Sequence, residues 1–95
     1  MADEEVARIL DGLIEKLAAV EHARWAHWQR YVHSKALRQP DGSLVLPAAL
    51  VAQWERQIAT DYPDLDDKEK ASDREQVRQY LPLIADALND RAPRR

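Results

Sequence analysis

The feature that most constrains the fold is a long stretch near the start of the chain without proline. From Asp3 to His33 there is no proline and a single glycine, Gly12. Apolar residues recur there every three or four positions, and about 100° of rotation per residue places them in one wedge of about 100° on an α-helix. One long helix is therefore predicted over about 3–33, with this wedge facing the core. The wedge contains Leu10, Ile14, Leu17, Trp25, Trp28 and Val32.

A loop and a second helix are predicted next. Residues 34–46, SKALRQPDGSLVL, contain a Pro-Asp-Gly turn signal followed by apolar residues. This pattern predicts an irregular loop with a short extended segment near 43–46. Pro47 suits the first position of a helix, so the second helix is expected over about 47–59. Its apolar stripe consists of Leu50, Val51, Trp54 and Ile58.

A third helix is predicted over about 66–89, after a tight turn at residues 60–65. Asp66 and Glu69 have the D-x-x-E spacing of a capping box, in which each side chain bonds to the backbone of the other residue. Pro82 has no N–H, so this helix is expected to bend nearby. The apolar stripe contains Val77, Leu81, Ile84 and Leu88.

Composition supports an all-α fold in one domain over 1–95, with a disordered tail at 90–95. The chain has 95 residues, 45% of them hydrophobic and 33% charged, with two glycines and no phenylalanine. A net charge of −3 gives no basic field for a nucleic acid polymer or an anionic membrane. There is no cysteine, no apolar run long enough to span a membrane and no secretory signal. We expect a cytoplasmic protein without a cofactor.

Charged residues interrupt two of the apolar stripes. Glu21 lies within the wedge of the first helix and Arg24 lies at its edge, whereas the stripe of the third helix continues back onto Lys70, Asp73 and Arg74. One interpretation is a buried ion-pair network that fixes how the two helices meet. The other is an anion pocket in which some of the basic groups are left for a ligand.

Aromatic residues form a second candidate site. Trp25, Trp28, Trp54 and Tyr62 could provide a platform on which a planar ring stacks. The alternative is that Trp25 and Trp54 belong to the core, since both lie on apolar stripes. The cations considered for phosphate contacts in this reading are Arg24, Arg30 and Arg56.

Enzymatic and metal functions are not indicated. The three histidines, His22, His27 and His33, do not share a helical face in the way that H-x-x-x-H would. No Gly-rich phosphate loop, nucleophile elbow or pair of catalytic carboxylates appears. The sequence therefore predicts neither catalytic residues nor a metal site.

The order of these features resembles the RyR domain, a small helical repeat named after ryanodine receptors and also found in short bacterial and phage proteins. The resemblance covers about residues 17–88 and is most specific in the L-x-x-x-E-K-x-x-D-R segment that opens the last helix. Its matching positions here are Glu21, Trp25, Trp28, Tyr62, Leu65, Glu69, Lys70, Asp73 and Arg74.

The resemblance implies a non-enzymatic module that binds an anionic, ring-containing ligand such as a nucleotide or a nucleotide-derived messenger. Because paired repeats are associated with nucleotide binding, it also implies a homodimer. The alternative is a structural or protein-interaction domain without a small-molecule ligand. The ligand-binding residues implied are Glu21, Arg24, Trp25, Trp28, Trp54, Arg56, Tyr62, Lys70, Asp73 and Arg74.

Overall fold

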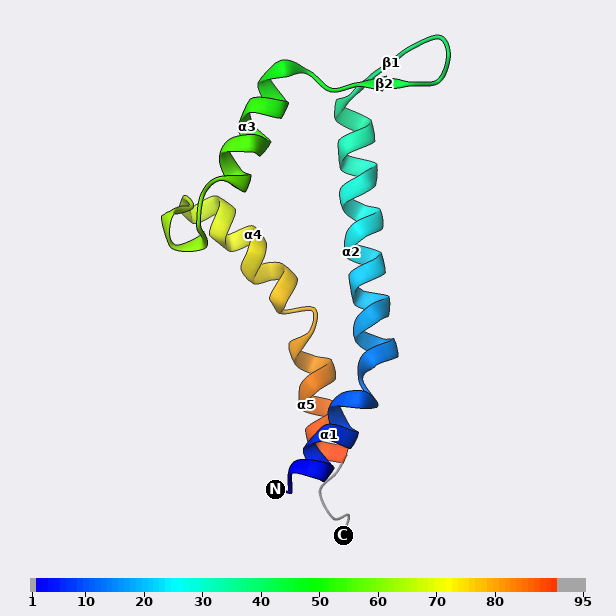
Figure 1. The fold of residues 1–95 in the computed structure, drawn as a ribbon, viewed down its shortest axis with the longest axis vertical. Coiled ribbons are helices and arrows are strands. Elements are labelled where there is room, and N and C mark those ends of the chain that lie inside the picture. The colour runs from blue at the N-terminus through cyan, green and yellow to red at the C-terminus, as the bar shows by residue number, and fades with distance from the viewer. Residues whose placement is uncertain (1, 91–95) are drawn as a thin grey trace. The chain divides into compact units, whose positions relative to one another are not determined.

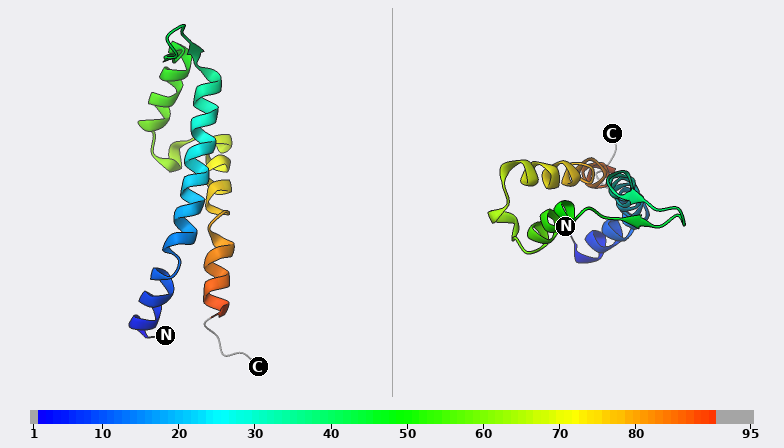
Figure 2. Two further views of the ribbon diagram at one scale, coloured as in Figure 1. Left: turned by 90° about the vertical axis from the view of Figure 1, so that its right-hand side faces the viewer. Right: turned by 90° about the horizontal axis from the view of Figure 1, so that it is seen from above.

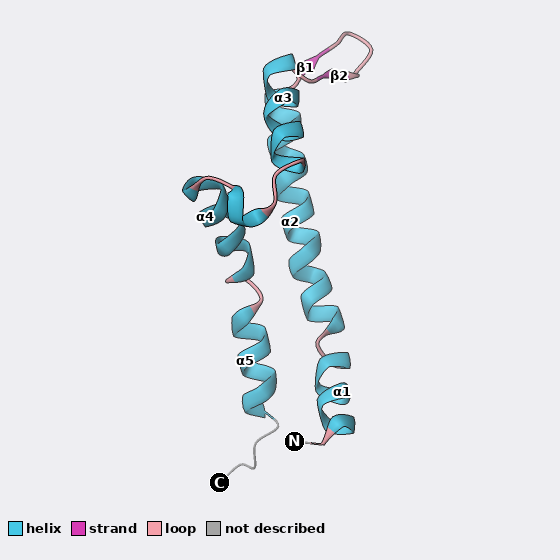
Figure 3. Cartoon of the chain, turned by 60° about the vertical axis from the view of Figure 1, so that its left-hand side comes forward, coloured by secondary structure: helices cyan, strands magenta, loops and turns pink. Residues whose placement is uncertain are grey.

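The structure is a computed structural model that describes residues 2–90 (Figure 1). The predicted all-α character is confirmed, since helices dominate the described chain (Figure 3). The elements in chain order are α1 (Asp3–Asp11), α2 (Ile14–Lys35), β1 (Leu37–Arg38), β2 (Leu44–Val45), α3 (Ala48–Ile58), the 3-10 helix η1 (Tyr62–Asp64), α4 (Asp67–Val77) and α5 (Leu81–Asp90).

The prediction of a single helix over 3–33 was wrong, because the chain breaks between α1 and α2. The interruption falls at Gly12 and Leu13. Glycine in a helix costs about 1 kcal/mol relative to alanine, so the helix is weakest at this position. The backbone N–H of Leu13 bonds to the carbonyl of Leu10, at 3.0 Å, in the tighter pattern of a turn. The predicted helix is thus two helices joined by a short turn.

The prediction of one bent helix over 66–89 also needs correction, because α4 and α5 are separate helices. Pro82 cannot donate the hydrogen bond that would carry a helix past Arg78. The chain instead turns through residues 78–80, where the N–H of Tyr80 bonds to the carbonyl of Val77 at 3.0 Å. A new helix then begins at Leu81, and its first turn tolerates the proline.

The capping box at the start of α4 is confirmed. The backbone N–H of Glu69 donates to Asp66 Oδ1 at 2.8 Å, and the backbone N–H of Asp66 donates to Glu69 Oε1 at 3.3 Å. These two bonds satisfy donors that a helix N-terminus would otherwise leave without partners. The sequence pattern therefore located this helix end correctly.

The extended segment predicted near 43–46 is one strand of a small hairpin. Strands β1 and β2 pair antiparallel, with Leu37 opposite Val45 and Arg38 opposite Leu44. Gly42 in the connecting turn has a φ of 90°, which glycine adopts at little cost. The loop predicted over 34–46 is therefore more ordered than the sequence indicated.

Asp41 organises the hairpin turn and should titrate below the usual range for aspartate. The hydroxyl and backbone N–H of Ser43 both donate to Asp41 Oδ1, at 2.6 and 2.9 Å. The hydroxyl bond is the larger cause, and both bonds lower the pKa of Asp41 because they favour the charged carboxylate. These bonds stabilise the folded state at pH values above the unfolded-state pKa of Asp41, and this stabilisation is lost as pH falls through the lower folded-state pKa.

Replacing Ser43 tests this assignment. In a carboxyl NMR titration, Ser43→Ala should raise the pKa of Asp41, because it removes the hydroxyl donor. An unchanged pKa would contradict the assignment.

The described chain divides into two compact units. Unit 1 contains residues 2–24 and 73–90, and unit 2 contains residues 25–72. The expectation of one domain over 1–95 stays a prediction. Of the tail predicted at 90–95, Asp90 is the last residue of α5, and residues 91–95 lie outside the described chain. No helix in residues 2–90 is long and apolar enough to cross a membrane.

Burial within unit 1 centres on the break between α1 and α2. Leu13 is 2% exposed and is the only fully buried hydrophobic residue within residues 2–90. Residues of α1, of the start of α2 and of α5 line one shallow depression beside it. The break therefore turns one leucine of the amphipathic stretch inward, while Leu10 and Ile14 on either side remain exposed.

In unit 2, α3 packs beside the C-terminal half of α2 (Figure 2). The rings of Trp28 and Trp54 meet edge to face, with centroids 5.6 Å apart. Tyr31, which is on the same helix as Trp28, adds a third ring, tilted by 31° and with its centroid 5.5 Å from that of Trp28. Such edge-on and tilted pairs are favoured by the charge distribution of aromatic rings. The Trp28–Trp54 pair therefore contributes to holding α3 against α2.

Candidate functional site

A shallow depression of about 510 Å³ lies on α2 and β1 and combines one tryptophan with basic side chains. We call it the α2–β1 pocket. Trp25 stands at one end and is 57% exposed, so the expectation that it belongs to the core was wrong. The residues that line the pocket are Trp25, Ala26, Gln29, Arg30, His33, Ser34 and Arg38.

The pocket follows two adjacent rows of side chains along α2. Residues four apart lie one above the other on a helix, and the second row is displaced from the first by about 100°. One row is Trp25, Gln29 and His33, and the other is Ala26, Arg30 and Ser34. Arg38 joins the pocket from β1, just beyond the last residue of α2.

The charged side chains that line this pocket are all basic. None of its lining residues is acidic. Residues 22–40 contain four Arg or Lys side chains and no Asp or Glu, in a chain whose net charge is −3. Anions should therefore be attracted locally even though the whole protein is acidic. This acid-free stretch is a sequence signal that would have pointed to Arg30 and Arg38.

Two of the basic side chains in this stretch can also stabilise the C-terminus of α2. His33 and Lys35 lie in the last turn of α2, where basic side chains compensate the partial negative charge of the free carbonyls. The hydroxyl of Ser34 donates to the carbonyl of Tyr31 at 2.7 Å and satisfies one of those carbonyls. Arg30 lies before the last turn of α2, so an interaction with the free carbonyls of the helix end does not explain its presence.

Glu21 is about half exposed and pairs with a residue of its own helix. Its carboxylate lies 2.8 Å from Nη2 of Arg24, three residues further along the same helix. Both side chains are about half exposed, at 49% and 51%. Such surface pairs contribute little to stability. The expected buried network around Glu21 is therefore replaced by a local pair at the surface.

The remaining charged residues of that network are spread along α4. Asp73 and Arg74 are exposed, and neither takes part in the ion pairs found within residues 2–90. Lys70 instead places its ammonium 5.8 Å from the ring centroid of Tyr62, a cation–π contact within unit 2. Among the predicted site residues, Lys70 and Tyr62 are thus together. Asp73 and Arg74 are not brought together by a shared ion pair among residues 2–90.

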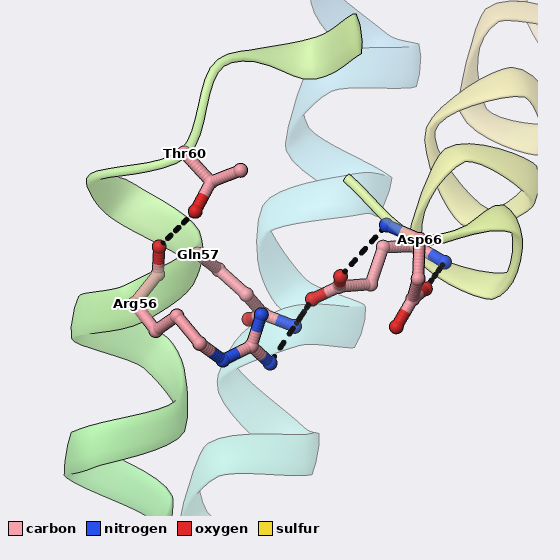
Figure 4. A network of polar contacts seen from close by, with 5 residues as sticks. Arg56, Gln57, Thr60 and Asp66 are labelled. Carbon is pink, nitrogen blue, oxygen red and sulfur yellow. Dashed lines mark hydrogen bonds and ion pairs between the residues drawn. The ribbon is translucent and has the colours of Figure 1, made fainter. Parts of the chain in front are cut away.

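Arg56 belongs to a separate polar network between α3 and α4 (Figure 4). The amide of Gln57 donates to Glu69 Oε2, and Nη2 of Arg56 lies 3.6 Å from the same oxygen. The side chain of Glu69 is 13% exposed, so this carboxylate is largely withdrawn from water. Thr60 closes the end of α3 by donating its hydroxyl to the carbonyl of Arg56 at 2.6 Å. Glu69 is thus the shared partner of Gln57 and Arg56, while the Arg56 side chain itself remains 58% exposed.

Within residues 2–90, no group of three or more His, Asp or Glu side chains is arranged to hold a metal ion. His33 lines the α2–β1 pocket, whereas His22 and His27 are not among its lining residues. The one histidine in the pocket therefore contributes to a surface with basic and aromatic side chains.

The predicted aromatic platform is divided between two places. Trp28 and Trp54 form the edge-to-face pair that joins α2 and α3, and Trp54 is half-buried. Trp25 lies on the pocket side of α2 and offers an exposed ring there. Trp25 is thus the one tryptophan among the residues that line the α2–β1 pocket.

No protein-family model, no curated protein and no solved structure matches this chain.

Proposed function

We propose that the protein is a small RyR-like binding module that holds a nucleotide or a nucleotide-derived signalling molecule in the α2–β1 pocket. The supporting observation is that Trp25, which is 57% exposed, lines the same depression as Arg30 and Arg38, and that none of the lining residues is acidic. An aromatic ring stacks on planar bases of any sequence. Guanidinium groups bind phosphate oxygens in pairs, which adds both energy and orientation.

Binding in this pocket would involve no bond chemistry. The base would stack on Trp25, and the phosphate would lie toward the basic end. Gln29 is half-buried between these ends and has an amide that can both donate and accept hydrogen bonds. Relative to the residues implied by the resemblance, this proposal keeps Trp25 and transfers the phosphate contacts to Arg30 and Arg38.

Titration calorimetry with ADP, cyclic di-AMP and ADP-ribose tests the proposal. We expect at least one ligand to bind, and Trp25→Ala or Arg30→Ala to weaken its binding by about tenfold or more, equivalent to about 1.4 kcal/mol. Arg78→Ala is the matched control, because Arg78 is an exposed arginine on the surface of unit 1. Circular dichroism should show that all variants remain folded. Heat signals that are flat for all three ligands would contradict the proposal.

A protein-interaction role is the second candidate, and the exposed apolar side chains favour it. Leu37 and Val45 face each other across the hairpin and both are exposed, as is Ile58 at the end of α3. Large exposed apolar surfaces commonly mark protein interfaces, including those of homodimers. Flat calorimetric titrations combined with concentration-dependent self-association in sedimentation would favour this role over nucleotide binding.

A further inference from the structure

Both glycines of the chain follow an aspartate, in Asp11–Gly12 and Asp41–Gly42. At an Asp–Gly peptide the side-chain carboxyl can react with the next backbone nitrogen, because glycine has no side chain to hinder the approach. The glycine nitrogen then bonds to Cγ of the aspartate, a carboxyl oxygen leaves as water, and a succinimide ring forms. When another water breaks the bond between this nitrogen and the original backbone carbonyl carbon, isoaspartate results. One water is released, one is consumed, and nothing is oxidised or reduced.

The two Asp–Gly peptides differ in how firmly the fold holds them. Asp11 ends α1, the N–H of Gly12 bonds to the carbonyl of Arg8 at 3.0 Å, and the next residue, Leu13, is 2% exposed. Freeing Gly12 would therefore disturb a helix end and expose the buried leucine. Gly42 lies instead in an exposed turn between two strands of two residues each. Such a short hairpin opens locally at little cost.

In the closed hairpin turn, hydrogen bonds hold both of the groups that would react. The N–H of Gly42 donates to the carbonyl of Gln39 at 3.0 Å. Oδ1 of Asp41 accepts the hydroxyl and the backbone N–H of Ser43, at 2.6 and 2.9 Å. The hydroxyl bond is also the larger cause of the lowered pKa of Asp41, and so reduces the protonated fraction, from which water leaves more readily. Ring closure therefore requires the turn to open and the carboxyl to leave Ser43.

We propose that Asp41 is a modification site at which isoaspartate forms by way of a succinimide with Gly42, and that the hydroxyl of Ser43 slows this reaction. Isoaspartate carries the chain through one additional methylene carbon and so lengthens the turn. The bond from the N–H of Gln39 to the carbonyl of Ser43, at 2.8 Å, closes the hairpin and would lose its present geometry. The modification would therefore uncouple β1 from β2. It is independent of the proposed nucleotide site.

Incubation of the full chain in isotopically labelled water, followed by digestion in ordinary water and mass spectrometry of the peptides, tests the proposal. Each passage through the succinimide adds one labelled oxygen to the aspartate, so the wild-type chain should gain label at Asp41 faster than at Asp11. Ser43→Ala should speed the gain at Asp41 by about fivefold, the rate equivalent of one ordinary hydrogen bond, and leave the gain at Asp11 unchanged. Ser43→Thr keeps a hydroxyl and should stay within about twofold of the wild type.

Three results would overturn the proposal. Label that enters Asp11 as fast as Asp41 would show that the fold does not select the hairpin. Equal rates at Asp41 in Ser43→Ala and the wild type would show that the hydroxyl does not protect the turn. In urea the two aspartates should gain label at similar rates, and a difference that persists there would assign the selectivity to local sequence instead of the turn. Far-UV circular dichroism of each variant before incubation distinguishes an open turn from an unfolded chain.

Discussion

Leu13→Ala is expected to lower the free energy of unfolding by about 3 kcal/mol, within the usual range for truncating a buried leucine. Leu13 is the residue that the break between α1 and α2 turns inward, and it is 2% exposed. Its truncation removes buried apolar surface and leaves a cavity that the neighbouring backbone can fill only in part. Urea unfolding followed by circular dichroism measures the change. Small domains have total stabilities of about 5–15 kcal/mol, so this loss should be large in proportion.

Leu10→Ala provides the matched control for this substitution. It removes the same atoms three residues earlier, but Leu10 is 56% exposed. We expect a loss of about 0.5 kcal/mol, typical of a surface position. Equal losses for the two variants would show that Leu13 is not the centre of burial in unit 1. A much larger loss for Leu10 would indicate that this side chain is covered in solution.

Glu69→Ala should lower the free energy of unfolding by about 2 kcal/mol, because it leaves several polar groups without their acceptor. The carboxylate accepts the side-chain amide of Gln57 and the backbone N–H of Asp66, and it lies 3.6 Å from Arg56. Gln57 is half-buried, so its amide does not recover full hydration when the partner is removed. Thermal and urea unfolding of the variant give the loss directly.

Glu75→Ala is the control, because Glu75 also lies on α4 and is also 3.6 Å from an arginine. The decisive difference is exposure, which is 68% for the side chain of Glu75 and 13% for that of Glu69. We expect Glu75→Ala to change stability by less than about 0.5 kcal/mol. Glu69→Gln keeps an oxygen acceptor and should fall between the two. Indistinguishable stabilities for Glu69→Ala and Glu75→Ala would contradict the structural role of the network.

The local signals in the sequence located most of the helices but not their interruptions. The capping box at Asp66 and the proline at 47 marked helix starts to within one or two residues. Gly12 and Pro82 were recognised as unusual positions, yet they separate helices where continuous ones were predicted. A glycine or a proline can either bend a helix or end it. The outcome depends on which groups bond to the backbone carbonyls that lose their helical hydrogen bonds there. Here tight turns pair the carbonyls of Leu10 and Val77 with the N–H groups of Leu13 and Tyr80, and a periodicity argument does not include such bonds.

The predicted site residues and the α2–β1 pocket overlap in one stretch of α2, but periodicity gave the wrong exposure for Trp25. Apolar periodicity placed Trp25 on the wedge that faces the core, whereas Trp25 is 57% exposed in the structure. Glu21 was expected to need a partner from α4, but Arg24 is near enough on its own helix. A wedge on a helical wheel gives the relative directions of side chains. It does not say which direction another element will cover.

The sequence by itself determined the helical character, the capped start of α4, the turn at Gly42 and the local excess of basic charge in residues 22–40. These properties depend on neighbours within a few positions, so one sequence suffices for them. Only the tertiary structure decided that Leu13 is buried, that Glu69 is shared between α3 and α4, and that Arg38 joins Trp25 in one pocket. These properties depend on contacts between separate elements, and local propensity and spacing do not specify such contacts.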